Sequence, residues 1–408
     1  MSMQKTRVLV LTSSFPRYKN DWWQRTILSI YSNMDLKKYS ITVVAPSGPD
    51  SLLSEKIGGI NVIRFNYFYP RSLQVLTSGE GILYSSKKNR ILGKIEMFTF
   101  IIAEFFTALK LLIKEDFDII HANWIIPQGF IATILGFIFQ KKVVVTVHGT
   151  DVFALKKLNF IKAFILKYCD LCTANSSVTR DAVKEIYPEA KVEIAYMGVD
   201  IRLFNPLKRN KSWAEGFGNN PKIILGVGRL IKWKGFEYLI KAYAQVLRSV
   251  PGAKLVLIGK GPEEDALKKL ARKLDLKENE GIFFMGTFGP DKLPMIYASS
   301  DLVVSPSISI AKTGEKEGQG NVVLEARASG VPVIASKSGG LIDTVDGETN
   351  GLLFEERDDK DLAKKIVSVL SDETLRKNLS KNGLTYVIEN FSWGKASSRF
   401  CKLYDEIL

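Results

Sequence analysis

Cysteine and histidine are both scarce in this chain of 408 residues, which contains three cysteines and two histidines. The odd number of cysteines excludes a framework of disulfides, and two histidines with distant cysteines do not make a closed zinc site. Cys169 and Cys172 stand three residues apart beside a strand-like run, where a free cysteine behaves as a small hydrophobic residue. We therefore expect buried structural cysteines, a reducing compartment and no metal site.

The chain also lacks a hydrophobic run that is long and uncharged enough to cross a bilayer, which takes about 20 residues. Ile125–Phe139 is short and contains Pro127, while Ile95–Ile113 contains Glu96 and Glu104. The apolar run that follows the basic N-terminal start is too short for the core of a signal peptide. These features predict a cytoplasmic protein, either soluble or peripheral to a membrane.

Acidic residues are fewer than basic ones, which gives a formal net charge of +14. This excess of positive charge favours anionic partners, namely phosphates, nucleic acid or an acidic membrane surface. No tract of five or more consecutive basic residues and no familiar nucleic-acid motif occurs, so we expect no nucleic-acid partner. The hydrophobic content of 46% excludes a mainly disordered chain.

Short β-branched runs alternate with helix-length amphipathic segments along the whole sequence, which is typical of parallel sheets flanked by helices. In the first half, the expected strands are Arg7–Leu11, Ile41–Ala45, Val62–Phe65, Ile119–Ala122, Val143–Val147, Leu171–Ala174 and Val192–Ala195. In the second half, they are Lys222–Val227, Lys254–Ile258, Ile282–Met285, Leu302–Ser305 and Val333–Ala335.

The alternation of strand-like and helix-like segments is interrupted at residues 205–220. These residues are polar and rich in glycine and asparagine, which predicts a linker. We predict an α/β protein of two doubly wound, Rossmann-like domains that face a cleft. The first domain spans residues 1–204 and the second 221–390, and the helical pattern of residues 391–408 predicts a helix that packs back on the first domain. Ligands of such sheets bind beyond the carboxyl ends of the strands.

Two stretches that follow predicted strands of the second half contain candidate ligand-binding residues. Gly228 and Arg229 end one strand, and Lys234 follows shortly before a helix. A guanidinium fork and a lysine point charge suit a diphosphate, although two solvated basic residues on a loop fit the pattern as well. Farther along, Glu317 and Glu325 flank the start of an apolar helix, where carboxylates can accept hydrogen bonds from sugar hydroxyls; the alternative is an exposed helix with solvated glutamates.

These stretches and several others resemble glycosyltransferase family 4, whose members have the GT-B fold. The resemblance rests on the Glu317-x7-Glu325 spacing and on the stretch from Gly228-Arg229 to Lys234-Gly235. It covers nearly the whole chain, with the motifs in the family's order. Further matches are Gly330–Ala335, Gly339-Gly340, Asn350–Phe354, Gly198–Asp200 with Phe204–Pro206, and His148–Asp151.

The resemblance implies that the second domain binds a nucleotide diphosphate sugar as donor. Arg229 and Lys234 would hold the diphosphate and offset the charge that develops on the leaving group, without a metal. Glu325 would bind the ribose hydroxyls, and Glu317 the donor sugar near its anomeric carbon. The residues expected to approach the phosphates through their backbone are Gly228, Gly318, Gln319, Gly320, Asn321 and Val322.

In the first domain, the resemblance implies that His148 touches the transferred sugar and orients it, with retention of the anomeric configuration. The family often has a glycine pair in the loop after the first strand, but residues 13–25 of this chain contain no glycine. The contacts of that loop therefore stay open, with Arg17 and Arg25 as possible substitutes at a phosphate.

Basic residues precede a strongly apolar segment with helical spacing at residues 85–114. The cluster consists of Lys87, Lys88, Arg90 and Lys94. It is a candidate surface for an acceptor or for an anionic membrane, and a solvated loop before an ordinary packed helix is the alternative.

The sequence thus predicts a metal-independent hexosyltransferase without a cofactor. It would transfer a sugar to a glycolipid or saccharide acceptor at the inner face of the cytoplasmic membrane, in polysaccharide or glycan biosynthesis. Two alternatives stay open: a nucleotide-sugar epimerase on the same fold, and a basic membrane-binding module without catalysis. The donor base, uridine or guanosine among them, is not readable from the sequence.

Overall fold

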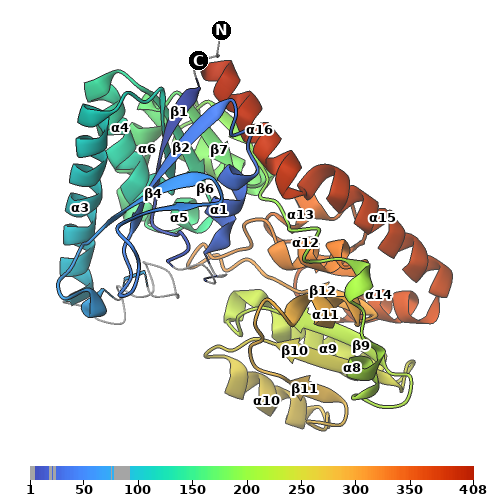
Figure 1. Cartoon of the computed structure of the whole chain (residues 1–408). Coiled ribbons are helices and arrows are strands. Elements are labelled where there is room, and N and C mark those ends of the chain that lie inside the picture. The colour runs from blue at the N-terminus through green and yellow to red at the C-terminus, as the bar shows by residue number, and fades with distance from the viewer. Residues whose placement is uncertain (1–4, 18–20, 22–23, 75, 78–91) are drawn as a thin grey trace. The chain divides into compact units, whose positions relative to one another are not determined.

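The computed structural model describes residues 5–17, 21, 24–74, 76–77 and 92–408. The chain divides into two units: Met1–Met197 with Ala396–Leu408, and Gly198–Lys395. Each unit consists of a central sheet covered by helices on both faces (Figure 1). The predicted linker, residues 205–220, lies within the second unit and includes a short helix, α8 (Lys211–Glu215).

The first unit contains an eight-stranded sheet in the order β3-β4-β2-β1-β5-β6-β7-β8. Its strands are β1 (Thr6–Thr12), β2 (Tyr39–Pro46), β3 (Ser54–Ile57), β4 (Ile60–Phe65), β5 (Ile119–Asn123), β6 (Lys142–Val147), β7 (Leu171–Ala174) and β8 (Val192–Ile194). All pairings are parallel except that of the edge strand β3 with β4. Because β2 and β5 lie on opposite sides of β1, the strand order reverses there, and the ends of β1 and β5 are level.

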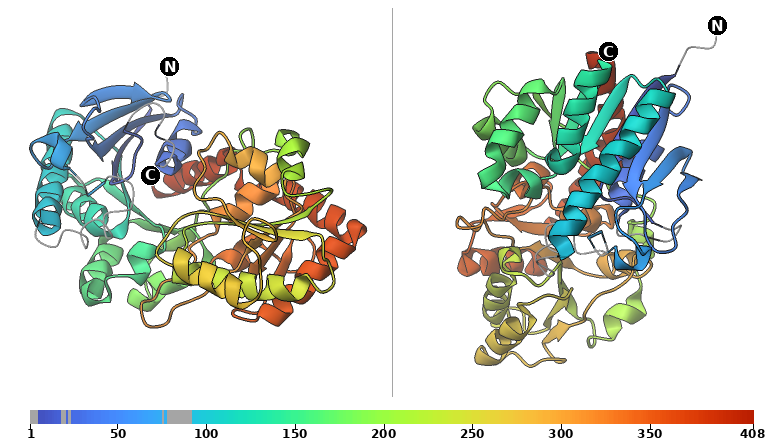
Figure 2. Two further views of the ribbon diagram at one scale, coloured as in Figure 1. Left: turned by 90° about the horizontal axis from the view of Figure 1, so that it is seen from below. Right: turned by 90° about the vertical axis from the view of Figure 1, so that its left-hand side faces the viewer.

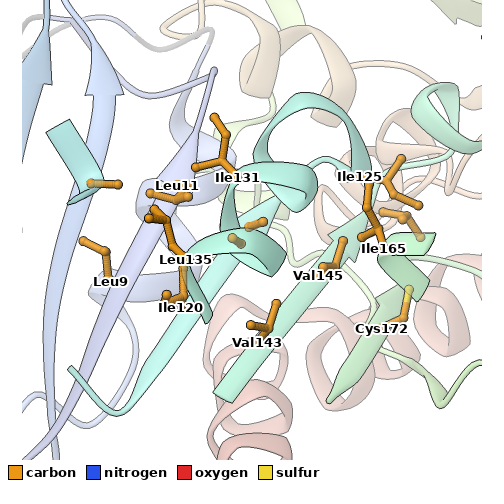
Figure 3. Packing of buried hydrophobic residues seen from close by; sticks show 14 of the residues in the cluster. Leu9, Leu11, Ile120, Ile125, Ile131, Leu135, Val143, Val145, Ile165 and Cys172 are labelled. Carbon is orange, nitrogen blue, oxygen red and sulfur yellow. The ribbon is translucent and has the colours of Figure 1, made fainter. Parts of the chain in front are cut away.

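Helices cover both faces of this sheet. They are α1 (Arg25–Ser32), α3 (Leu92–Lys114), α4 (Phe130–Phe139), α5 (Thr150–Phe153), α6 (Asn159–Tyr168), α7 (Ser177–Ile186) and most of α16 (Trp393–Ile407), with the short turns η1 (Arg71–Leu73), η2 (Ile125–Gly129) and η3 (Lys156–Leu158). Helices α3, α4 and α6 pack on one face, where Leu9, Ile120, Leu135 and Ile165 form part of a continuous core (Figure 3).

On the other face, a buried polar cluster joins α1 and α16 to the sheet. The Nδ1 atom of His121, on β5, is hydrogen-bonded to the hydroxyls of Tyr31 on α1 and Tyr404 on α16. Its Nε2 atom lies 2.6 Å from Oγ1 of Thr146. Burial lowers the pKa of His121 to about 3, so the ring is neutral. His121 is thus a buried, hydrogen-bonded structural residue.

The second unit contains a six-stranded parallel sheet in the order β11-β10-β9-β12-β13-β14. Its strands are β9 (Lys222–Val227), β10 (Ala253–Ile258), β11 (Ile282–Phe284), β12 (Leu302–Ser305), β13 (Val333–Ser336) and β14 (Leu352–Phe354). Its helices are α9 (Phe236–Val246), α10 (Glu264–Lys273), α11 (Leu293–Ala298), α12 (Asn321–Ala328), α13 (Leu341–Thr344), α14 (Asp359–Ser371) and α15 (Glu373–Phe391), besides α8 and the turns η4 (Pro206–Lys208) and η5 (Lys232–Lys234). The strand order reverses between β9 and β12, so the loops after these two strands define the crevice where a ligand of this unit is expected.

No helix among the described residues combines the length and the apolar character that crossing a membrane would require.

Candidate functional site

The candidate site of the second unit lies beyond the carboxyl ends of β9, β12 and β13. Its central feature is an ion pair, in which Nζ of Lys234 donates to Oε2 of Glu317 at 2.6 Å. Both side chains are largely buried, and Oγ of Ser307, just after β12, donates to the same carboxylate oxygen at 3.1 Å. A lysine ammonium has three donors, so the pair leaves donors of Lys234 for an anionic ligand.

Glycines allow the backbone to approach closely around this ion pair. Gly235 has φ of 68°, and a Cβ atom there would lie 1.9 Å from the carbonyl oxygen of Pro306. Gly339 has φ of 55°, and its Cβ would lie 2.2 Å from the carbonyl oxygen of Glu317. The amide of Gly340 donates to that carbonyl at 3.0 Å. These contacts fix Lys234 and Glu317 through the backbone, at positions where any side chain would collide.

Glu325 lies one helical turn inside α12, where Tyr297 of α11 donates its hydroxyl to Oε2 at 2.8 Å. Burial raises the pKa of Glu325 to about 7, while the hydrogen bond from Tyr297 and the charge of Lys234 act in the opposite direction. Glu325 is therefore a carboxyl group that changes its charge near neutral pH.

The other predicted donor residues lie on the loop after β9 and around the start of α12. The aliphatic part of the Lys234 side chain lies beside Gly228, at the end of β9, and Arg229 follows with an exposed side chain. Gly320 precedes α12 with φ of 86°. Because glycine has no side chain, this residue cannot cap the first amides of the helix. Along the segment that leads into α12, Gly318 and Val322 are half-buried, Gln319 and Gly320 are buried, and Asn321 is exposed.

In the first unit, Asp151 ties together the loops that follow β5 and β6. Its buried carboxylate accepts hydrogen bonds from the amides of Ile125 and His148, both at 3.0 Å. Lys162 of α6 is buried beneath α5 and donates to the carbonyls of Val152 and Ala154, at 2.8 and 2.6 Å. These charged groups hold His148 in place through its backbone, which leaves its ring available.

The ring of His148 faces Trp124, with the ring centres 5.2 Å apart. Nε2 of His148 is buried and has no hydrogen-bond partner among the residues that the structure describes. Burial lowers the pKa of His148, and the nearby Asp151 raises it, with burial the larger effect. The ring is thus a neutral, desolvated group with one unused nitrogen, which is suited to a hydrogen bond with a ligand.

Sequence reasoning missed Trp124. Its φ of 92° is rare for a residue with a bulky side chain, and such strained backbone occurs most often at functional sites. The strain is supported by hydrogen bonds from its amide to Thr146 and from Gly129 to its carbonyl. Its position directly after β5, at the reversal of strand order, is the signal that could have identified it.

The remaining predicted residues lie apart from these clusters or outside the described residues. Lys87, Lys88 and Arg90 are among the residues that the structure does not describe, while Lys94 is exposed in the first turn of α3. In the glycine-free loop after β1, Nε of Arg17 donates to the buried Asp21 at 2.8 Å.

A cavity of about 1000 Å³ opens at the opposite edge of the second sheet, near the amino ends of β9, β12 and β13. Its lining includes Arg209, Lys222, Asp301 and Arg376, but none of the predicted donor residues. Within the described part of the chain, no three His, Cys, Asp or Glu side chains gather in a way that could hold a metal ion.

Comparison with known proteins identifies the family. The profile of "Glycosyltransferase Family 4" matches residues 24–203, and that of "Glycosyl transferases group 1" matches residues 208–385. An uncharacterized glycosyltransferase of Methanocaldococcus jannaschii is 30% identical over 315 residues, which cover 72% of this chain and 77% of the relative. A GDP-mannose-dependent alpha-(1-6)-phosphatidylinositol monomannoside mannosyltransferase of Mycobacterium tuberculosis is 27% identical over 297 residues, covering 71% and 76%.

Among solved structures, a sucrose-phosphate synthase from Thermosynechococcus elongatus superposes with a TM-score of 0.76 at 21% identity, over 99% of both chains. The two parallel-sheet units therefore have the architecture of the GT-B fold. The chain belongs to glycosyltransferase family 4 and is a glycosyltransferase.

Proposed function

We propose that this glycosyltransferase transfers a sugar from a nucleotide diphosphate sugar to a glycolipid or saccharide acceptor, with retention of configuration and without a metal ion. The observation that carries the proposal is the buried pair of Lys234 and Glu317 beyond the ends of β9 and β12. In this pair a fixed cation lies beside a carboxylate where the strand order reverses, which is where a ligand of such a sheet is expected.

In this proposal, Lys234 and Arg229 bind the diphosphate and stabilise the charge that grows on it as the bond to the sugar breaks. A preorganised cation is effective here because it needs no reorganisation in the transition state. Glu317 binds hydroxyls of the donor sugar while it holds Lys234 in position, and Glu325 accepts hydrogen bonds from the ribose. The backbone amides from Gly318 to Val322 add contacts to the phosphates.

We assign His148 of the first unit to the transferred sugar. Its neutral ring and its unused Nε2 support this role, because a buried nitrogen without a partner is stabilised by a ligand hydroxyl. Asp151 keeps the loop that carries His148 in position, and Trp124 limits the orientations of the ring.

We further propose that the acceptor is lipid-linked and that the protein works at the cytoplasmic face of a membrane, in the assembly of a polysaccharide or another glycan. The mycobacterial relative is named for a phosphatidylinositol-based acceptor, and the net charge of +14 suits an anionic surface. Membership of a glycosyltransferase family favours this reaction over the epimerase and over a module without catalysis.

A thermal-shift panel of UDP, GDP, ADP and their sugar conjugates, measured with EDTA present, tests the donor site. Binding to the folded state raises the melting temperature by mass action, so the nucleotide that binds best identifies the base. We expect one nucleotide family to raise the melting temperature of the wild type and to have a much smaller effect on Lys234→Ala.

Lys232→Ala is the matched control, because Lys232 is an exposed lysine of the same turn. It should respond to nucleotides like the wild type. If no nucleotide shifts the wild type, or if Lys234→Ala responds fully, the donor site proposed here is wrong. Product analysis with the donor alone separates transfer from epimerisation.

A further inference from the structure

The outer face of the first unit carries an unusual concentration of exposed aromatic and aliphatic side chains. Helix α4 contacts α3 and α6, so the three helices form one layer on the same face of the sheet (Figures 1 and 2). The exposed side chains of this layer are Ile95, Phe98, Ile102, Phe106 and Ile113 on α3, Phe130, Phe137 and Ile138 on α4, and Phe160, Phe164 and Tyr168 on α6. We call this set the aromatic face.

The exposed fraction of the side chains on the aromatic face ranges from 37% for Phe130 to 83% for Phe137. Phe98, Phe106, Phe137 and Phe160 have 66%, 61%, 83% and 71% of their surfaces accessible. The face is continuous between α4 and α6, because the ring of Phe164 on α6 lies 6.5 Å from that of Phe130 on α4, and α3 packs beside α4. Exposed apolar patches of this kind mark surfaces that bind a partner or a membrane.

On α3, charged and apolar side chains are arranged in the reverse of what is usual for a helix that faces solvent. Both acidic residues of α3, Glu96 and Glu104, are fully buried, on the side that faces the sheet. Gln128 donates to Glu104 at 3.0 Å, and burial raises the pKa of Glu104 to about 8. The helix therefore places its carboxyl groups inward and its phenylalanines outward.

The exposed charges of this layer are all positive. Within α3, α4, η3 and α6, all of whose residues the structure describes, no acidic side chain is exposed. The exposed charged residues of these segments are Lys94, Lys110, Lys114, Lys156, Lys157 and Lys167. The acids that directly follow α3 are already paired, Glu115 with Arg7 and Asp116 with Lys141.

We propose that the aromatic face and its lysines dock the enzyme onto an anionic phospholipid bilayer. Aromatic side chains enter the boundary between headgroups and acyl chains, while lysines beside them bind anionic headgroups. A two-fold contact between copies would bring lysine against lysine without an exposed acid of these helices to pair with, so the charge pattern disfavours a homodimer. The inference rests on the proposed lipid-linked acceptor and identifies the surface that would bring the enzyme to it.

Cosedimentation with vesicles tests the proposal, with phosphatidylcholine vesicles compared with vesicles of equal parts phosphatidylcholine and phosphatidylglycerol. We expect the wild-type chain to bind the anionic vesicles only. Phe137→Ser combined with Phe160→Ser should weaken this binding by about tenfold or more, because both rings leave the bilayer boundary. Leu207→Ser is the matched control, since Leu207 is 94% exposed in the second unit.

A charge-reversal variant, Lys156→Glu with Lys157→Glu, should also weaken binding by about tenfold and should reduce its dependence on salt. The control is Lys273→Glu with Lys277→Glu, two exposed lysines of the second unit, which should bind like the wild type. Wild-type binding by the phenylalanine variant would overturn the proposal. So would a wild-type dimer that the phenylalanine variant converts to a monomer without a change in vesicle binding.

Donor binding is measured on the same samples by thermal shift. The phenylalanine variant and the charge-reversal variant of Lys156 and Lys157 should both respond to the nucleotide like the wild type, because none of the substituted residues belongs to the donor site. Loss of vesicle binding with intact donor binding supports the docking surface. Vesicle binding without any response to nucleotides would contradict the proposed function and leave the docking surface in place.

Discussion

The candidate sites of the two units are built in opposite ways. In the second unit, opposite charges meet at 2.6 Å between Lys234 and Glu317, and glycines bring the backbone against them. In the first unit, the ring that faces a ligand is neutral: His148 is desolvated, and the charges of Asp151 and Lys162 are satisfied by hydrogen bonds with backbone groups. The first arrangement suits a charged diphosphate, and the second suits the hydroxyls of a sugar.

The difference shows where each site obtains its rigidity. Steric contact fixes the second site, because Gly235 and Gly339 leave no space for a side chain. Hydrogen bonds to buried charges fix the first site, because one carboxylate holds two loops. Substitutions should therefore affect affinity for the donor in one unit and the efficiency of transfer in the other.

The largest effect is expected for Lys234→Ala, which removes the fixed cation of the second site. We expect kcat/KM to fall by about 10²-fold or more, the usual effect of losing one preorganised charge contact. Lys232→Ala should change kcat/KM by less than about threefold. Initial rates with the identified donor and an acceptor measure both, and an effect of Lys234→Ala as small as that of the control would make Lys234 a bystander.

Gly235→Ala tests whether steric contact fixes this site. The new Cβ would meet the carbonyl of Pro306 at a backbone conformation that alanine disfavours, so we expect a loss of about 2 kcal/mol in stability and weaker donor binding. Gly252→Ala is the control, because no atom lies within 4 Å of its added Cβ. Urea unfolding and calorimetric donor binding measure the two effects; equal stability of the two variants would refute the close approach.

Trp124→Ala tests the neutral site of the first unit. If Trp124 positions His148, kcat should fall by about tenfold while the donor affinity stays the same. Trp124→Phe keeps an aromatic ring beside His148 and should restore most of the activity. A fall in donor affinity, or no benefit from phenylalanine, would show that the ring contact has no positioning role.

The smallest effect is expected at Glu325, whose titration should make the affinity for the donor depend on pH. Its pKa of about 7 means that the carboxyl is neutral below that pH and charged above it. Because the charged form is the stronger hydrogen-bond acceptor, affinity for a nucleotide sugar should rise by a few fold as the pH increases through about 7. Glu325→Gln should abolish this rise, and calorimetry across the pH range would detect an unchanged slope if Glu325 is not responsible.

The sequence predicted most of the fold, because buried parallel strands are recognisable as short β-branched runs. Lys222–Val227 and Leu302–Ser305 match β9 and β12 residue for residue. The strands that it missed, β3 and β14, are short, and β3 is a partly exposed edge strand without an apolar run. The long helix α15 was missed as well, because its apolar residues do not form a clear stripe.

The candidate donor site was predictable because glycines and charges leave a signature in the sequence around Lys234 and Glu317. The pairing of these two side chains was not, since they are far apart in the chain and only the sheet brings them together. Trp124 was missed for a related reason, because its strained backbone follows from hydrogen bonds made by residues of other elements. The aromatic face was predictable only in part. Lys94 and the strongly apolar segment of α3 stood out in the sequence, whereas the contributions of α4 and α6 depend on how these helices pack.

The contact of Tyr404 with His121 has a consequence for the order of folding during synthesis. The first unit needs residues 396–408 for its buried polar cluster, yet these residues leave the ribosome after all of the second unit. Domains generally fold in the order in which they are made. In this chain the first unit cannot complete its core until α16 has been synthesised. The second unit can therefore finish folding while the face of β5 that packs against α16 is still uncovered.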